Sequence, residues 1–367
     1  MFYIGLMSGT SMDAIDVALV RFDEDSFSVA EYRQYPYADA IRSEARNLSG
    51  ESPVAEVARL DAVLGGLFSA AVLAMLDQAG LKAADVAAVG SHGQTILHLP
   101  DTRPPRTLQI GDPNLIARRT GITTIADFRR MDMAAGGQGA PLAPAFHARY
   151  FHSPDADRVI LNVGGIANIT ILPRDPAAAV TGFDTGPGNG LLDDWNQLHN
   201  DTPMDRNGEW AESGTAREDL LRNLLEDPYF TLPPPKSSGR DYFNLEWLGR
   251  HLEAYPDAVP EDVQATLLLL SARSIIGAVI REAPATTELY VCGGGVHNPR
   301  LLKELRQEQP ALKIASTSEL GLDPDAVEAV TFAWLAKQRL ENRPGNLPAV
   351  TGAEREVLLG GVYTPSQ

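Results

Sequence analysis

Apolar and polar residues alternate along the chain in short runs that predict strands and helices in turn. Residues 3–6 and 15–20 are predicted strands joined by a small polar turn, and apolar residues at helical spacing predict one or two helices over 52–79. A strand, a helix capped by Asp112 and another strand follow between 85 and 128. Such alternation is typical of an α/β fold.

The second half of the chain repeats this design. We place the domain crossing near the Gly- and Pro-rich segment MAAGGQGAPLAP. Just after it, RVILNVGGIANITIL has an apolar strand, a glycine turn and a second strand, as the N-terminus does. The halves share element types but not residues, so the pattern predicts a duplicated α/β domain.

The remaining elements follow similar patterns. VTGFDTGPGNGLLDDWNQL predicts a strand, a glycine-rich loop and a helix. An apolar helix over 263–281 leads to the strand ELYVCGG, and DPDAVEAVTFAWLAKQRL predicts a late helix with Pro324 at its start. The proline-rich stretch 222–243 is too polar for a core and is a candidate mobile lid.

Composition narrows the classes of function. The length of 367 residues predicts two domains, and the net charge of −17 would repel nucleic acid and anionic membrane surfaces, so we expect neither as a partner. The single Cys292 fits a reducing compartment. The N-terminus does not have the pattern of a signal peptide, and polar residues interrupt ATLLLLSARSIIGAVI before it reaches a membrane-spanning length. We therefore expect a cytoplasmic protein.

Several common chemical fingerprints are missing from the sequence. It has no Gly-Lys dipeptide for a P-loop, no GxGxxG, no HExxH, no CxxC and no GxSxG, so we expect no structural metal and no serine-hydrolase elbow. Three glycine-rich turns remain, MSGTSMD, NVGGIANI and CGGGVHN, each after an apolar strand. Taken singly, each fits an ordinary hairpin turn. Together, because glycine lets main-chain amides approach an anion, they favour a nucleotide held between two domains.

These turns belong to a longer series of motifs: MSGTSMDAID, GSHGQTI, ADFRRMD, GGQGAPLAPAFH, LNVGGIANIT, GFDTGPGN and CGGGVHNP. In this order, over nearly the whole chain, they resemble the 1,6-anhydro-N-acetylmuramic acid kinases of the sugar kinase, Hsp70 and actin superfamily. The resemblance implies an α/β fold of two ribonuclease-H-like (actin-like ATPase) domains with ATP in the cleft between them. We place the domains at 1–133 plus 343–367 and at 134–342. It also implies a homodimer.

The resemblance further implies which residues hold the nucleotide. The first phosphate loop comprises Gly9, Thr10, Ser11, Met12, Asp13, Ala14, Ile15 and Asp16. Gly164 and Gly165 lie on the second loop, and Gly293, Gly294, Gly295 and Asn298 face the adenosine. Many members have glycine where this chain has Ala14. We expect Asp13 or Asp16 to hold Mg²⁺ through water, because ATP chemistry needs its charge offset. Alternatively, these two carboxylates cap a helix or face solvent.

Asp184 is the candidate catalytic base. The pattern places it at a strand end on a loop of three glycines beside a helix start, where a substrate can approach closely. The alternative is a loop aspartate that accepts hydrogen bonds from main-chain amides. The resemblance assigns this position to water activation. A 1,6-anhydro sugar has no free 6-hydroxyl, so water must open the ring at C1 while O6 takes the γ-phosphoryl group.

The sugar carries a lactyl carboxylate that needs a local positive charge, and Arg129 and Arg130 are the candidates. Either arginine can instead pair with Asp127 or Asp132 at the surface. His92 and Gln94 are candidate contacts to hydroxyl or amide groups, and Glu328 is a further candidate; a structural histidine and a solvated helix face are the alternatives. The sequence thus favours an anhydro-sugar kinase in cell-wall recycling. Another sugar kinase of this superfamily, or a nucleotide-switched binding protein, are the alternatives.

Overall fold

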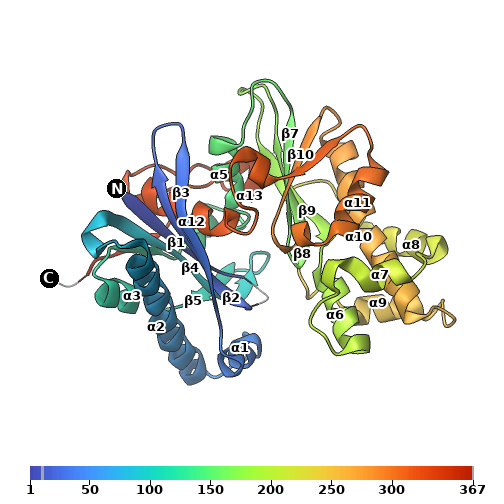
Figure 1. Cartoon of the computed structure of the whole chain (residues 1–367), viewed down its shortest axis with the longest axis horizontal. Helices are drawn as coiled ribbons and strands as arrows, with labels where there is room; N and C mark the ends of the chain where they lie inside the picture. Colours follow the sequence, from blue (N-terminus) through green and yellow to red (C-terminus); the bar gives the residue numbers. More distant parts are fainter. Residues whose placement is uncertain (10–11, 366–367) are drawn as a thin grey trace. The chain divides into compact units, whose positions relative to one another are not determined.

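The computed structural model describes residues 1–9 and 12–365, and its packing divides the chain into two compact units. Unit 1 comprises Met1–Tyr150 with Ala326–Gln367, and unit 2 comprises Phe151–Asp325. Figure 1 shows both, with unit 2 running from green to orange.

Within the described residues, unit 1 contains a seven-stranded sheet. Strands β1, β2 and β3 form an antiparallel meander, β4 and β6 continue the sheet in parallel with β1, and β5 and β12 pair antiparallel with β4 and β6. The strands are β1 (Phe2–Ser8), β2 (Ala14–Phe22), β3 (Phe27–Pro36), β4 (Val86–Leu99), β5 (Arg106–Ile110), β6 (Thr124–Ala126) and β12 (Gly361–Tyr363). Strand β4 continues through GSHGQT, where the sequence predicted a loop.

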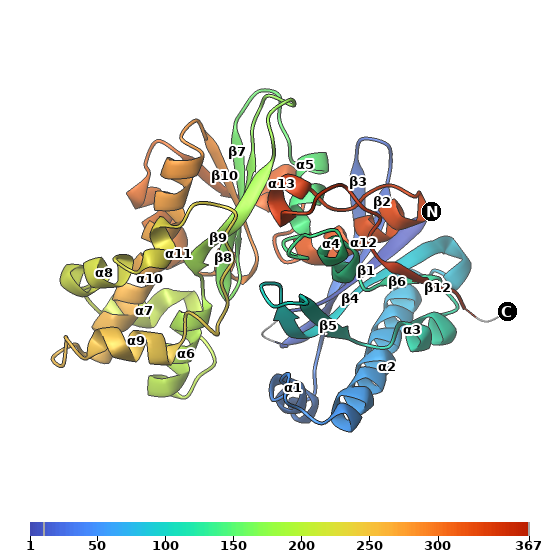
Figure 2. The same ribbon diagram turned by 180° about the vertical axis from the view of Figure 1, so that it is seen from behind.

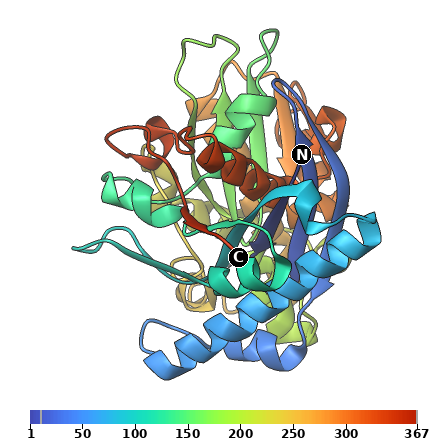
Figure 3. The same cartoon turned by 90° about the vertical axis from the view of Figure 1, so that its left-hand side faces the viewer.

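Helices cover both faces of this sheet (Figure 3). Ile4 and Leu6 of β1 share a buried core with Leu60 of α2. Gly5 points to the opposite face, where an added Cβ would lie 1.7 Å from the carbonyl oxygen of Ala329 in α12. The helices are α1 (Asp39–Arg46), α2 (Val54–Ala79), α3 (Pro113–Thr120), α4 (Arg129–Ala134), α5 (Ala143–Tyr150), α12 (Val327–Leu340), α13 (Pro348–Thr351) and the 3₁₀ turn η1 (Ala83–Asp85).

The two units differ from the division expected from the sequence. The first crossing falls after Tyr150 and not at 133/134, because α5 packs on α12. The second falls before Ala326 and not at 342/343, because α12 packs on β1 and β4. The late helix therefore belongs to unit 1, although the sequence analysis placed it in the second domain.

Unit 2 is built on a five-stranded sheet in the part of the chain that the structure describes. Strands β7, β8 and β9 are antiparallel, and β10 and β11 continue in parallel with β7. The strands are β7 (Arg158–Val163), β8 (Ile166–Leu172), β9 (Thr181–Pro187), β10 (Glu288–Cys292) and β11 (Lys313–Ser316). Apart from β5, which branches from β4, and the edge strand β12, the two sheets share one order. It is β3-β2-β1-β4-β6 in unit 1 and β9-β8-β7-β10-β11 in unit 2, which is the ribonuclease-H-like arrangement. The duplicated α/β fold is confirmed.

A single long helix organises the core of unit 2. Buried residues of α10 (Pro260–Glu282) pack on one side with the sheet and on the other with the small helices before it (Figure 2). Those elements are α6 (Gly190–Asn200), η2 (Arg206–Gly208), α7 (Glu209–Ser213), α8 (Glu218–Leu225), η3 (Pro228–Thr231) and α9 (Leu245–Leu252). After α10 come η4 (Gly294–His297), α11 (Pro299–Glu308) and η5 (Thr317–Leu320).

Two helices, α2 and α10, are long and apolar enough to cross a membrane by length and composition alone. The expectation that the apolar stretch within α10 is too short for this is therefore wrong. However, 83% of the most apolar window of α10 and 50% of that of α2 are buried inside the protein. Core helices of soluble proteins pass the same test, so these helices are weak support for a membrane span.

Candidate functional site

The turn between β1 and β2 is the first expected phosphate loop. It begins at Gly9, where an added Cβ would meet nothing within 4 Å. Met12 closes it with an N–H donated to the Gly9 carbonyl at 3.1 Å, a φ of 52° and a buried side chain. Thr10 and Ser11 lie outside the described residues. The open space above Gly9 suits a group that approaches the main chain closely.

Two carboxylates flank this turn. Asp13 is exposed and forms an ion pair with Arg42 of α1. Asp16, on β2, accepts hydrogen bonds from the Tyr32 hydroxyl at 2.6 Å and from Gln34 at 3.0 Å. The expected alternative of a helix cap does not apply, because both residues lie at or in a strand.

Polar side chains support the turn from behind. The Tyr37 hydroxyl donates to Ser8 at 2.8 Å, and Ser8 donates to the Gln94 side-chain oxygen at 2.6 Å. Gln94 is buried, and its side-chain oxygen is engaged in this internal chain of hydrogen bonds, while its predicted contact with the substrate stays a prediction. Ala14 and Ile15 belong to β2, and Ile15 packs in the core.

His92 and Arg129, two predicted sugar contacts, come together. His92 Nδ1 lies 2.8 Å from the Gly93 carbonyl oxygen, and Arg129 donates to His92 Nε2 from Nη2 at 2.8 Å and Nε at 3.2 Å. Burial and the charge of Arg129 lower the pKa of His92 well below its ordinary value. The imidazole is therefore neutral, with its proton on Nδ1.

Asp132 holds the loop to which Arg129 binds. Its buried carboxylate accepts hydrogen bonds from the Gly139 N–H at 2.8 Å and from Asn346 and Thr351 at 2.7 Å each. Arg129 donates to the Gly139 carbonyl at 2.8 Å. Asp132 thus binds the loop and the C-terminal segment, and it is not the surface partner of an arginine that the sequence analysis considered.

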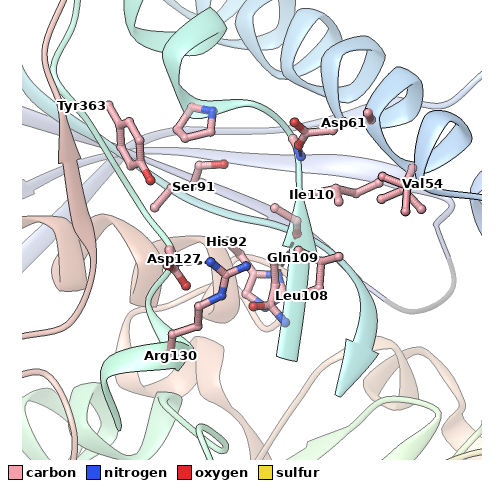
Figure 4. Close-up of a pocket in the computed structure, with 16 residues that line it drawn as sticks. Val54, Asp61, Ser91, His92, Leu108, Gln109, Ile110, Asp127, Arg130 and Tyr363 are labelled. Atoms are coloured by element: carbon pink, nitrogen blue, oxygen red, sulfur yellow. Dashed lines mark hydrogen bonds and ion pairs between the residues drawn. The ribbon is translucent and has the colours of Figure 1, made fainter. Parts of the chain in front are cut away.

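Arg130 and Asp127 lie at a cavity of about 300 Å³ in unit 1 (Figure 4). Their ion pair is long, at 3.5 Å, and Asp127 has a φ of 61°, which is uncommon for a residue other than glycine. Ser91 lines the same cavity, and its buried hydroxyl has no hydrogen-bond partner among the described residues. His92 and Tyr363 also contribute to the lining. A small polar molecule would find charged and unpaired groups here.

Glu328 lies in the first turn of α12. Its side chain is accessible to solvent, yet the surrounding protein removes enough water to raise its pKa to about 7; Asp16 raises it further, while Arg129 lowers it. These charges lie on the predicted site residues of unit 1. The exposure of Glu328 agrees with the alternative of a solvated helix face, and its predicted role as a substrate contact stays a prediction.

Two glycine-rich segments of unit 2 meet backbone to backbone. The N–H groups of Gly188 and Gly190 both donate to the Gly165 carbonyl at 3.0 Å, and that of Asn189 donates to the Gly164 carbonyl at 2.8 Å. A Cβ at Gly188 would lie 2.4 Å from the Gly164 oxygen. The GPGNG loop therefore needs glycine at this position to pack on the β7–β8 turn.

The third glycine turn follows β10 beside the same segments. Gly293 has a φ of 75°, and a Cβ at Gly295 would come within 2.4 Å of the Val163 side chain. At Gly294, in contrast, nothing lies nearer than 4.0 Å, so this backbone is open. Asn298, predicted to face adenosine, accepts two main-chain N–H groups at 3.1 Å each as the N-cap of α11. Its side-chain oxygen is thus engaged within the protein.

Asp184 lies within β9, opposite Asn168, and not at a strand end as predicted. The strand continues past Asp184 to Pro187, and Gly186 and Pro187 still pair with Ala167 and Ile166 of β8. Three contacts hold Asp184: its Oδ2 accepts from the Ser238 N–H at 2.9 Å, its main-chain oxygen from the Tyr229 hydroxyl at 2.8 Å, and its N–H donates to the Lys236 carbonyl at 3.1 Å. The half-buried carboxylate is oriented on a rigid element.

The environment of Asp184 also sets its protonation. Burial raises its pKa to about 6, while the Ser238 N–H and the charge of Lys236 lower it. At neutral pH the carboxylate is therefore mostly ionised and can accept a proton.

Sequence reasoning missed the residues that surround Asp184. Lys236, Ser238 and Tyr229 all come from the proline-rich stretch, which was predicted only as a mobile lid. In the structure this stretch packs against β9, and Lys236 is only 8% exposed. The local sequence, KSSGR directly after three prolines, is also compatible with an exposed linker, so it gave no signal that this lysine is buried.

The described residues contain no group of three or more His, Cys, Asp or Glu side chains that could hold a metal ion. Any Mg²⁺ would therefore take most of its ligands from a bound phosphate and from water, with Asp13 or Asp16 as the carboxylates near the β1–β2 turn.

Comparison with known proteins identifies the family. The family model described as anhydro-N-acetylmuramic acid kinase matches residues 1–365. An anhydro-N-acetylmuramic acid kinase from Coxiella burnetii (strain Dugway 5J108-111) is 49% identical over 361 residues, covering 98% of this chain and 97% of that protein. Another, from Shewanella pealeana (strain ATCC 700345 / ANG-SQ1), is 49% identical over 364 residues, covering 99% and 98%.

Solved structures resemble the chain only distantly. The activator of the 2-hydroxyisocaproyl-CoA dehydratase from Clostridium difficile, with bound ADPNP, has 13% identity and a TM-score of 0.45, covering 93% of this chain and 98% of that one. This likeness carries no functional argument. The sequence relatives do, and they decide against a nucleotide-switched binding protein. The chain belongs to the anhydro-N-acetylmuramic acid kinase family, and it is an enzyme, a phosphotransferase.

Proposed function

We propose that this enzyme opens the 1,6-anhydro ring of 1,6-anhydro-N-acetylmuramic acid with water and phosphorylates O6, giving N-acetylmuramic acid 6-phosphate and ADP. The observation that carries this proposal is the Asp184 carboxylate. It is half-buried, oriented by the Ser238 N–H and ionised near neutral pH, in a chain of this kinase family. These are the properties of a general base.

The reaction balances as follows. Asp184 takes a proton from water, and the water oxygen forms a bond to C1 while the bond between C1 and O6 breaks. O6 takes the γ-phosphoryl group, and ADP departs. The logic is that of an inverting glycosidase in which a phosphoryl group replaces the acidic proton at the leaving oxygen.

The residues present fit a nucleotide. Gly9 and Gly294 leave open space where a Cβ would otherwise stand, and both follow apolar strands at glycine-rich turns. Their main-chain N–H groups can donate hydrogen bonds to phosphate oxygens. Such donors are needed because the net negative charge of the protein repels a phosphate group. Bound ATP with Mg²⁺ would supply the phosphoryl group and offset its charge. Asp13 and Asp16 are the proposed carboxylates for Mg²⁺, and the β7–β8 turn is the proposed second phosphate loop.

The cavity beside Arg130 is the proposed site for the sugar. Arg130 can give its charge to the lactyl carboxylate, because its ion pair with Asp127 is long and its side chain is 55% exposed. Arg129 already donates hydrogen bonds to His92 and to the Gly139 carbonyl, so we assign it the role of holding His92 and not of binding the sugar. The unpartnered Ser91 hydroxyl offers a hydrogen bond to a sugar substituent.

A substrate panel tests the activity. Release of ADP from ATP is measured with 1,6-anhydro-N-acetylmuramic acid, glucose, N-acetylglucosamine and no sugar. We expect ADP release with the anhydro sugar only. Equal release without sugar, or a preference for glucose, would contradict the proposal. A cytoplasmic location stays a prediction from the sequence pattern, and a role in cell-wall recycling and a homodimer stay predictions from the family resemblance.

The sugar site is tested by Arg130→Gln. Loss of the charge should raise KM for the anhydro sugar at least tenfold, while KM for ATP stays within about twofold, because one charge-assisted contact to a carboxylate is worth roughly 1.5–3 kcal/mol. Steady-state kinetics with each substrate varied in turn measure both constants. Arg118→Gln, on α3 and outside the cavity lining, is the matched control. An unchanged sugar KM in Arg130→Gln would remove Arg130 from the site.

A further inference from the structure

Lys236 is a buried lysine with no carboxylate partner among the described residues. Its Nζ donates to the Tyr229 carbonyl at 2.9 Å and lies 4.5 Å from the centre of the Tyr229 ring and 5.8 Å from that of Phe183. Burying an ammonium group costs desolvation free energy, and one hydrogen bond to a neutral acceptor and two aromatic faces offset it only in part.

A role for this buried charge is suggested by what else the same segment binds. Lys236 accepts the Asp184 N–H through its main-chain oxygen, and Ser238, two residues on, donates its N–H to the Asp184 carboxylate. Tyr229, whose carbonyl holds the ammonium group, donates its hydroxyl to the Asp184 main-chain oxygen. The Lys236 side chain therefore connects the segment at Tyr229 with the segment 236–238, and both segments form hydrogen bonds to Asp184.

Few charged side chains act on Asp184 and Lys236. Asp184 on β9 and Lys236 on the loop act on each other, Tyr229 faces both, and Arg281 and Glu282 at the end of α10 act on Lys236 with opposite signs. The charge of Lys236 lowers the pKa of the Asp184 carboxyl group.

We propose that Lys236 is a positioning residue for Asp184: its ammonium group anchors the loop on β9, and its charge favours the carboxylate form of Asp184. The inference rests on the proposed function only in giving Asp184 the role of base. Burial raises the pKa of Asp184 and the charge of Lys236 lowers it, which agrees with this role. Burial also lowers the pKa of Lys236, to about 8, so the ammonium form persists at neutral pH.

The test measures the pKa of Asp184 directly, without using activity. The enzyme is labelled with ¹³C at the aspartate carboxyl carbons and titrated by NMR, and the Asp184→Asn variant identifies the resonance. Lys236→Gln keeps a donor for the Tyr229 carbonyl but removes the charge. We expect it to raise the pKa of Asp184 by on the order of one unit, as loss of an opposite charge does. Lys236→Arg, which keeps the charge, should leave it near the wild-type value.

An Asp184 pKa in folded Lys236→Gln equal to that of the wild type would overturn the proposal. If Lys236→Gln does not fold, Lys236→Met, which fills the apolar surroundings without charge, is titrated in the same way with the same two outcomes. The pH profile of kcat provides a second readout, whose acid limb should move upward with the NMR value. Absence of anhydro-sugar activity in the wild type would contradict the proposed function alone, because the titration remains measurable.

Discussion

Asp184 must be ionised before it can take a proton from water, and its pKa of about 6 sets the pH range in which that holds. Above pH 6 the carboxylate form dominates, and below it each further unit of pH leaves about tenfold less of the base. At the scale of the residue, the account therefore depends on one carboxylate, whose pKa is raised by burial and lowered by its contacts.

The first prediction concerns pH. Because the base is the deprotonated form, kcat/KM for the sugar should fall on the acid side with a limb near pH 6 and a slope approaching tenfold per unit. Initial rates between pH 5 and pH 8 measure this, with ATP saturating. A flat profile down to pH 5 would show that no group with this pKa has to be ionised.

The second prediction is that Asp184→Asn loses turnover but retains nucleotide binding. General-base catalysis contributes roughly 10²–10⁴-fold, so kcat should fall by about that factor. Calorimetric titration with an ATP analogue should give an affinity like that of the wild type. Asp175→Asn, an exposed carboxylate on the β8–β9 loop of the same unit, is the control and should keep its activity. Near-wild-type kcat in Asp184→Asn would remove the residue from the mechanism.

At the scale of the element, close backbone contacts fix where α12 docks. Cβ atoms added at Gly5 and Gly90 would come within 1.7 Å and 2.0 Å of carbonyl oxygens of α12. The sheet can accept the helix at this distance only because these strand positions have no side chain. This packing brings Glu328, in the first turn of α12, into the electrostatic surroundings of Asp16 and Arg129.

The third prediction follows from this packing. Gly5→Ala should lower the free energy of unfolding by on the order of 1–3 kcal/mol, because α12 has to move away from the sheet. Denaturant titration measures the change. Gly277→Ala, at an exposed helical position of α10 with nothing within 4 Å, should instead be neutral or stabilising by up to about 1 kcal/mol. Equal stability of Gly5→Ala and the wild type would contradict the close contact.

The elements that the sequence revealed were those with a strong local signal. Strand β1, helix α2 and the three glycine turns follow from apolar period and glycine placement alone. Strands β3 and β12 were missed because β3 is largely exposed on the sheet edge and β12 has only three residues. Neither has the apolar pattern of a core strand.

The same limit applies to the site. Asp184, His92 and Arg129 were predicted from motifs, but the residues that hold Asp184 and Asp132 in place were not. The Lys236 carbonyl accepts the Asp184 N–H although the two residues are more than 50 positions apart. Asn346 donates to Asp132 over a separation of 214 positions. Contacts between such distant segments depend on tertiary packing, which local patterns do not encode.

At the scale of the whole molecule, one sheet order occurs twice and each copy carries different chemistry. Unit 1 holds the paired His92 and Arg129 and the cavity beside Arg130, while unit 2 holds Asp184 and the stacked glycine turns.

The central claim is that water opens the sugar ring, and the fate of the water oxygen tests it most directly. The reaction is run in H₂¹⁸O with ATP and 1,6-anhydro-N-acetylmuramic acid, and the product is reduced at C1 immediately after quenching and analysed by mass spectrometry with fragmentation. A control with unlabelled product corrects for exchange at C1. The account predicts one ¹⁸O atom at C1 and none at O6. A product without ¹⁸O at C1, or with the label at O6, would contradict it.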